Sequence, residues 1–126
     1  MILGGNATVY VSDFERAVRF YTEALGLALR FRAENRWAEV AAGDRFVIGI
    51  HPVTPTTPKA GVAGSVQIGL DVEAPLERTM ERLAARGVRF DGPIVGDPKA
   101  GLRFAFLRDP DGNPIYLWES GGAGAE

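Results

Sequence analysis

The strongest constraint on this chain is a pattern that occurs twice, once in each half. Asn6 opens a segment of alternating polar and apolar residues, a helical stretch follows, and Gly26 ends it. Gln67 lies 61 positions after Asn6 and opens a similar segment, and Gly87 lies 61 positions after Gly26. Two copies are too few for a solenoid, which needs about three or more repeats. We therefore expect a duplicated half-domain with a ligand cleft between its halves.

The composition fits one ordinary globular domain of 126 residues, with 46% hydrophobic and 24% charged residues. The net charge of −2, with scattered Lys and Arg, argues against a nucleic-acid-binding face. The absence of cysteine excludes disulfides, thiolate metal sites and a Cys nucleophile. No segment reaches the ~18 apolar residues of a membrane span, and the N-terminus lacks a signal-peptide pattern. We expect a cytoplasmic protein with no membrane partner, and the abundance of Ala, Arg and Gly suggests a bacterial source.

In the first half, Ala7–Val11 alternates as a strand. Ser12 and Glu15 form a capping box that begins a helix, and Gly26 ends it. The helix carries a buried stripe at helical spacing, namely Phe14, Val18, Tyr21 and Leu25. Three further strands are expected at 27–32, 37–41 and 46–51.

The second half repeats this order of elements. A strand is expected at 66–72, then a helix from Pro75 to Gly87 with a buried stripe of Leu76, Met80 and Leu83. Strands follow at 88–90, 103–108 and 114–119, and the last two flank a hairpin turn at 109–113. Pro110 fixes φ in this turn, while Gly112 and Asn113 tolerate positive φ. Each half is therefore expected to be a βαβββ module.

These elements divide a single domain, 1–126, into a first module at 1–51 and a second module at 65–120. Residues 52–64 connect the modules and contain Pro52, Pro55 and Pro58, which exclude a helix or a central strand. This segment is either a flexible linker or a lid over the cleft. The Gly- and Ala-rich end, 121–126, is expected to be a frayed tail.

Two segments carry a resemblance to a known family: Val9-Tyr-Val-Ser-Asp-Phe-Glu-Arg-Ala-Val-Arg-Phe-Tyr-Thr-Glu-Ala-Leu-Gly26 and Leu107-Arg-Asp-Pro-Asp-Gly-Asn-Pro-Ile-Tyr-Leu117. The pattern resembles the vicinal oxygen chelate superfamily, which includes glyoxalase I, bleomycin-resistance proteins, fosfomycin-resistance enzymes and extradiol dioxygenases. The resemblance implies an α+β fold, in which paired βαβββ modules form curved mixed sheets around a cavity. It also implies a homodimer.

Enzymes of this superfamily usually hold one divalent metal, with ligands from the first and last strands of each module. The matching positions here are Asn6, Gly49, Gln67 and Tyr116. Amide oxygens and a neutral phenol bind first-row metals weakly, and a catalytic site generally needs about three good protein ligands. We therefore expect no metal and no other cofactor. The resemblance then favours the bleomycin-resistance branch, whose members bind a drug and sequester it.

Strand alternation predicts which residues face the cavity. The expected ligand-binding residues lie on strands opposite the helix-facing positions, and they are Asn6, Thr8, Tyr10, Trp37, Glu39, Gly49, His51, Gln67, Tyr116 and Trp118. Aromatic walls with a few polar groups suit a flat organic ligand. Alternatively, this face is solvated or buried in a dimer contact. His51, the only histidine, is a lone metal ligand with Glu39 as its possible companion, a general base at the cavity rim, or merely a strand-end residue.

Two functions remain open. The first is a metal-free protein that binds and sequesters an aromatic small molecule, such as an antibiotic. The alternative is a lyase, isomerase or dioxygenase that uses displaced metal ligands, or metal-free acid–base chemistry through His51 or Tyr116. The ligand set favours the first function, but no residue is assigned a catalytic role.

Overall fold

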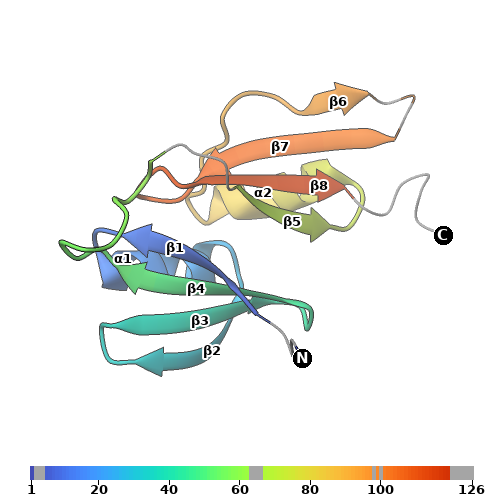
Figure 1. Cartoon of the computed structure of the whole chain (residues 1–126). Helices are drawn as coiled ribbons and strands as arrows, with labels where there is room; N and C mark the ends of the chain where they lie inside the picture. The colour runs from blue at the N-terminus through green and yellow to red at the C-terminus, as the bar shows by residue number, and fades with distance from the viewer. Residues whose placement is uncertain (2–4, 63–66, 98, 100, 120–126) are drawn as a thin grey trace. The chain divides into compact units, whose positions relative to one another are not determined.

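The computed structural model of the chain describes residues 1, 5–62, 67–97, 99 and 101–119. The chain forms two compact units. The first comprises Met1–Val62 together with Asp109–Asn113, and the second comprises Ala63–Arg108 together with Pro114–Glu126. Each unit has its own four-stranded sheet, with a helix packed on one face (Figure 1).

The first unit contains β1 (Ala7–Val11), α1 (Phe14–Arg19), a π-helical turn (Phe20–Ala24), β2 (Ala28–Ala33), β3 (Trp37–Ala42) and β4 (Phe46–Pro52). Its strand order is β1-β4-β3-β2. β1 runs parallel to β4, and the other neighbours are antiparallel. The helix that follows β1 provides the crossover that a parallel pair requires.

The second unit contains β5 (Ile68–Val72), α2 (Leu76–Ala85), β6 (Val95–Asp97), β7 (Leu102–Arg108) and β8 (Pro114–Glu119). Its order, β5-β8-β7-β6, repeats that of the first sheet, again with one parallel pair. The predicted architecture of paired βαβββ modules with mixed sheets is therefore confirmed. The repeat read from the sequence corresponds to a repeat of strand order.

The prediction of a strand at 88–90 is wrong. Val88 is buried instead, and Phe90 makes an isolated bridge to Leu107. The fourth strand of this sheet is β6, which pairs with β7 further along the chain. After this single bridge the chain bends at 91–93, where Gly92 has φ of 86°, so the pairing does not extend into a ladder.

Alternation decides which side of each sheet is buried. Helix-facing positions of the strands are apolar and buried, and they are Val9, Val11, Ala38, Val40, Ile48 and Ile50 in the first unit and Ile68, Leu70, Ala105, Leu107, Ile115 and Leu117 in the second. Phe14 and Val18 of α1 and Leu76 and Leu83 of α2 are also buried, as predicted. Met80, the third residue of the predicted α2 stripe, is only half-buried. The opposite positions lie on the face of each sheet away from its helix, which we call its open face.

The start of α1 differs from the expected capping box. Asp13 is the N-cap, and its side chain accepts a hydrogen bond from the backbone N–H of Arg16 at 3.1 Å. Ser12 instead donates its hydroxyl to Asp111. Glu15 forms ion pairs with Arg32 and Arg19 rather than reaching back to the cap. A long-range partner for Ser12 therefore moves the cap one residue along the chain.

The end of this helix also differs from a regular α-helix. Leu25 N–H bonds to the Phe20 carbonyl at 2.9 Å, five residues back, which widens the last turn. Tyr21 remains fully buried, whereas Leu25 is only half-buried. Gly26, with φ of 80°, ends the helix as predicted, and Gly87, with φ of 96°, does the same after α2.

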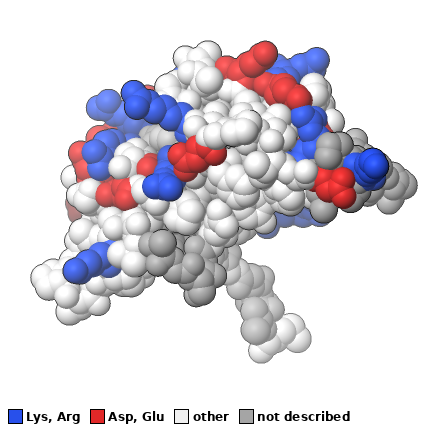
Figure 2. Space-filling model, turned by 90° about the horizontal axis from the view of Figure 1, so that it is seen from above, with Lys and Arg blue, Asp and Glu red and all other residues white. Residues whose placement is uncertain are grey.

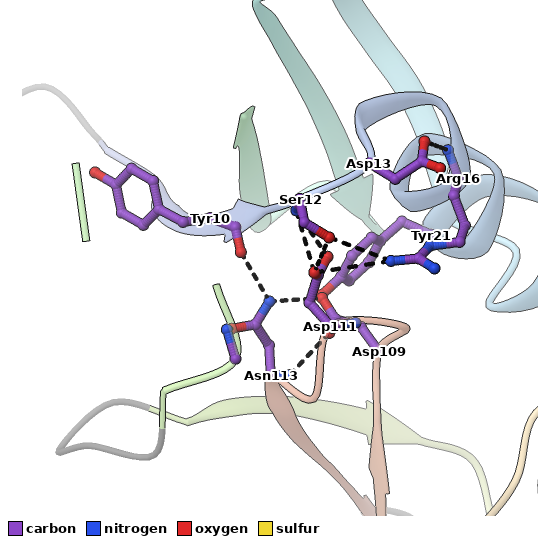
Figure 3. Close-up of polar contacts among 9 residues, drawn as sticks. Tyr10, Ser12, Asp13, Arg16, Tyr21, Asp109, Asp111 and Asn113 are labelled. Carbon is purple, nitrogen blue, oxygen red and sulfur yellow. Dashed lines mark hydrogen bonds and ion pairs between the residues drawn. The ribbon is translucent and has the colours of Figure 1, made fainter. Parts of the chain in front are cut away.

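The turn at 109–113 belongs to the first unit although it connects two strands of the second (Figure 3). Asp111 accepts hydrogen bonds from Ser12, and Asn113 donates its side-chain amide to the Tyr10 carbonyl at 3.2 Å. Gly112 has φ of 90°, as predicted, but Asn113 does not adopt positive φ. Asn113 serves as a side-chain donor and acceptor rather than as a flexible turn residue.

The connecting segment is described as far as Val62, where Gly61 N–H donates to the Asn113 side chain at 3.1 Å. Its remaining residues and the predicted tail, 121–126, lie outside the described residues. Within the described residues, no helix is long and apolar enough to cross a membrane.

Candidate functional sites on the open faces of the two sheets

The open face of the first sheet gathers six of the predicted site residues. Strand register places Thr8 beside Gly49 and Tyr10 beside His51 across β1 and β4. Glu39 of β3 pairs with Gly49 from the other side. Trp37, two residues before Glu39 on β3, lies on the same face because side chains alternate. All of these side chains are half-buried, and Gly49 is buried.

Trp37 lies directly over Gly49. A Cβ atom built on Gly49 would approach the Trp37 ring atom Cη2 to 2.2 Å, so no larger residue fits there without moving the ring. The indole Nε1–H of Trp37 donates to Oε2 of Glu39 at 2.9 Å. The contact with Gly49 fixes the position of the Trp37 indole ring, and the hydrogen bond fixes Oε2 of Glu39 relative to that ring.

His51 lies beside two aromatic rings. Its ring centroid is 5.6 Å from that of Tyr10 and 6.2 Å from that of Trp37. Its Nδ1 atom is 2.7 Å from the carbonyl oxygen of Pro52, which can only accept a hydrogen bond. We therefore assign the hydrogen to Nδ1, and in the neutral ring Nε2 is then an acceptor.

The open face of the second sheet carries a cluster of four aromatic side chains. Tyr116 and Trp118 of β8 were predicted, and register places Phe106 and Phe104 of β7 beside them. Phe104 is 5.8 Å from Tyr116 and 5.4 Å from Trp118 between ring centroids, and 6.4 Å from Phe106. All four side chains are half-buried. The surface offers adjacent rings for stacking.

A glycine again accommodates an aromatic ring in this sheet. A Cβ atom on Gly69 would approach Cζ of Tyr116 to 2.4 Å, so the tyrosine lies against bare backbone of β5. Gly69 and Tyr116 are directly paired in the parallel ladder. The two open faces thus share one construction, in which an aromatic ring covers a glycine of a neighbouring strand.

Phe104 and Phe106 were missed from the sequence. The signal was present, because Ala105 and Leu107 of the same strand are fully apolar and buried under α2. Alternation then directs Phe104 and Phe106 to the open face. Apolar residues on both faces of a short strand hide this pattern, since periodicity alone does not separate the two sides.

Asn6 and Gln67 precede β1 and β5, and both are exposed. The Asn6 side-chain oxygen accepts a hydrogen bond from Thr8 at 3.0 Å. Together with Gly49 and Tyr116, they are the residues that the superfamily resemblance matches to metal ligands. Within the described residues, no group of three His, Cys, Asp or Glu side chains could hold a metal ion. The donors present do not fit a divalent metal.

The shifted ionisable groups lie away from the open faces. Burial, followed by the Asp109 charge, raises the pKa of Tyr21 well above its ordinary value. Hydrogen bonds from Arg32 and Arg103 lower the pKa of Glu15 and Glu77, respectively. Basic and acidic residues are interspersed on the surface that Figure 2 shows, without a large region of one sign.

Comparison with known proteins identifies the family. Residues 5–117 match the sequence profile of the Glyoxalase/Bleomycin resistance protein/Dioxygenase superfamily. The chain belongs to this superfamily. This confirms the resemblance drawn from the sequence, and the match spans both modules.

Relatives within this superfamily carry different names. A probable lactoylglutathione lyase of Vibrio parahaemolyticus is 30% identical over 128 residues, covering 91% of this chain and 88% of the relative. The crystal structure of TnmS3, an antibiotic binding protein from Streptomyces sp. CB03234, is similar with 32% identity and a TM-score of 0.72, over 94% and 98% of the two chains. A glyoxalase/bleomycin resistance protein from the same Streptomyces strain is 34% identical, with a TM-score of 0.69 over 91% and 100%.

Proposed function

We propose that this chain is a metal-free binding protein of the superfamily, which sequesters a flat aromatic small molecule such as an antibiotic. The observation that carries the proposal is the aromatic open face of the second sheet. Phe104, Phe106, Tyr116 and Trp118 are adjacent and half-buried there. Each well-oriented aromatic contact contributes about 0.5–1.5 kcal/mol beyond the area that it buries.

Two further observations support this proposal. The residues at the family's metal-ligand positions, Asn6, Gly49, Gln67 and Tyr116, are poor ligands, so metal-dependent polarisation of a substrate lacks its basis here. One of the similar solved structures is an antibiotic binding protein. The open face of the first sheet is a further candidate surface for a ligand, and Glu39 and His51 are its polar groups.

The experiment is a thermal-shift screen of aromatic natural products, because a ligand that binds the native state raises its stability. A hit is then titrated by tryptophan fluorescence. We expect Trp118→Ala to weaken binding by about 1–3 kcal/mol while the protein stays folded. Phe20→Leu is the matched control, because Phe20 packs edge-on against Tyr21 on the helix side of the first unit. Equal affinities of wild type and Trp118→Ala for every hit would contradict the proposal.

Elemental analysis tests the metal-free character. We expect no stoichiometric divalent metal in the purified protein. One tightly held Zn, Mn, Fe or Ni per chain, with loss of thermal stability on chelation, would contradict it. Gln67→His alone should not create a metal site, since Asn6 and Tyr116 would still be poor ligands.

An enzymatic role is the second candidate, and the Nε2 acceptor of His51 favours it. An enzyme that uses this base would lose turnover in His51→Ala with little loss of affinity. A binding protein would lose affinity in the same variant and show no turnover in wild type. Incubation of each screening hit with wild type, followed by mass analysis, separates the two.

A further inference from the structure

The two carboxylate oxygens of Glu39 differ in their hydrogen bonding. Oε2 accepts the indole N–H of Trp37 at 2.9 Å. Oε1 has no hydrogen-bond or ion-pair partner within the residues that the structure describes. The backbone of Glu39 is fixed in β3, and the hydrogen bond from the Trp37 indole restrains its carboxylate. Oε1 is therefore oriented in one direction. A half-buried, oriented carboxylate oxygen is a strong acceptor for a charged donor.

His51 adds a second acceptor to the same face. Its Nδ1–H is held by the Pro52 carbonyl, which leaves Nε2 as the acceptor of the neutral ring. Its ring lies diagonally from Glu39 on the neighbouring strand β4, since Glu39 pairs with Gly49. The rings of Tyr10 and Trp37 flank it at 5.6 and 6.2 Å. Aromatic faces carry partial negative charge and attract cations.

The residues that strand register places on this face carry charge of a single sign. Strand register places these residues on the open face of the first sheet: Thr8, Tyr10, Ala28, Phe31, Ala33, Trp37, Glu39, Ala41, Val47, Gly49 and His51. It does not assign Arg30, which lies at the bulge between Leu29 and Phe31. Among these described positions Glu39 is the one acid, and no Lys or Arg is present. The face therefore offers acceptors and aromatic rings, and it would repel a carboxylate or phosphate.

We propose that Glu39, positioned by Trp37 and supported by His51, selects aromatic ligands that carry a protonated amine. The ammonium group would donate to Oε1 of Glu39 and to Nε2 of His51, and its charge would lie near the Trp37 and Tyr10 rings. This inference rests on the proposed function, and it adds the chemical class of the ligand. Trp37 is a positioning residue for the carboxylate as well as a stacking surface.

The test uses three probes that share one planar ring system and differ in charge. They are 9-aminoacridine, which is cationic near neutral pH, acridine, which is neutral, and acridine-9-carboxylate, which is anionic. Affinities for the wild-type protein are measured by fluorescence titration or calorimetry. We expect 9-aminoacridine to bind about tenfold or more tightly than acridine, the size of effect typical of a charged hydrogen bond, and acridine-9-carboxylate to bind most weakly.

Three variants test which residues are responsible for the preference for an amine-bearing ligand. Glu39→Gln should reduce the ratio of the two affinities, 9-aminoacridine over acridine, to about one. Trp37→Phe keeps an aromatic ring but removes the N–H that orients Glu39, so it should reduce the ratio in part. Asp44→Asn, in the exposed turn before β4, removes the same charge from the same sheet and should leave the ratio unchanged. Circular dichroism and thermal melting confirm that each variant folds.

The outcomes separate this inference from the proposed function. If all three probes bind with similar affinity, the protein binds aromatic ligands but the amine preference is wrong. If the preference survives in Glu39→Gln, or disappears in Asp44→Asn, the residue assignment is wrong. If none of the probes binds to wild type while uncharged aromatic hits from the screen do, the cationic class is overturned. If neither probes nor screen give a ligand, both proposals fail.

Discussion

Tyr21 is fully buried, and its hydroxyl donates to Oδ2 of Asp109 at 2.8 Å. The same carboxylate accepts the side-chain amide of Asn113 at 2.8 Å and the backbone N–H groups of Asp111 and Asn113 at 3.0 and 2.8 Å. Asp109 therefore organises the turn and binds it to the first unit (Figure 3). A buried carboxylate is tolerated only with such compensation.

The Tyr21 contact gives a prediction at high pH. Burial and the Asp109 charge raise the pKa of Tyr21, so the native state keeps the phenolic proton where the unfolded chain has lost it, above pH ~10. The unfolded state then binds fewer protons, and the free energy of unfolding falls as pH rises. Below this range the full stabilisation is present.

Tyr21→Phe should lower the free energy of unfolding by about 1–2 kcal/mol near neutral pH, because Asp109 loses one buried donor. It should also show a shallower decline above pH ~10 than wild type, because its buried ring has no proton to lose. Urea denaturation at both pH values measures the two effects. Parallel declines of wild type and variant would show that Tyr21 is not the group responsible.

The start of α2 depends on a residue from another element. Pro75 is the N-cap and offers no side-chain acceptor, and the N–H of Leu76 donates instead to Oε2 of Glu119 on β8 at 2.8 Å. Arg103 of β7 contacts Glu119 at 3.2 Å and also pairs with Glu77 of α2. A strand carboxylate thus performs the capping that the helix sequence itself lacks.

Glu119→Ala should therefore destabilise the protein by about 1–3 kcal/mol, since it removes the cap and one partner of Arg103. Glu119→Gln should cost less, because the amide oxygen can still accept the Leu76 N–H. Glu81→Ala, on the exposed side of α2, should change stability by less than ~0.5 kcal/mol. Chemical denaturation of the three variants measures this order, and an equal loss in Glu119→Ala and Glu81→Ala would contradict the assignment.

For the whole molecule, the proposal is a homodimer. The superfamily resemblance implies it, and two-fold dimers are the commonest assembly. Leu29 and Phe31 of the edge strand β2 are 48% and 53% exposed, which is apolar surface that an assembly could bury. Light scattering at micromolar concentration should give twice the chain mass of 13.5 kDa. A species of 13.5 kDa at that concentration would contradict the proposal.

Periodicity and turn residues predicted most of the fold. β1 and β8 have the bounds expected, and the glycines after both helices end them as predicted. Two of the errors have a common cause. The roles of Ser12 and Asn113 depend on hydrogen-bond partners far along the chain, Asp111 and Tyr10, which local patterns do not contain.

The sequence by itself determined the duplicated βαβββ order and the helix-facing cores. These follow from residue type and short-range periodicity. Only the tertiary structure decided that Trp37 covers Gly49 and orients Glu39, that Phe104 and Phe106 join Tyr116 and Trp118, and that Glu119 caps α2. Such contacts are set by strand register between separate segments, and a register is a property of pairs of strands rather than of either strand alone.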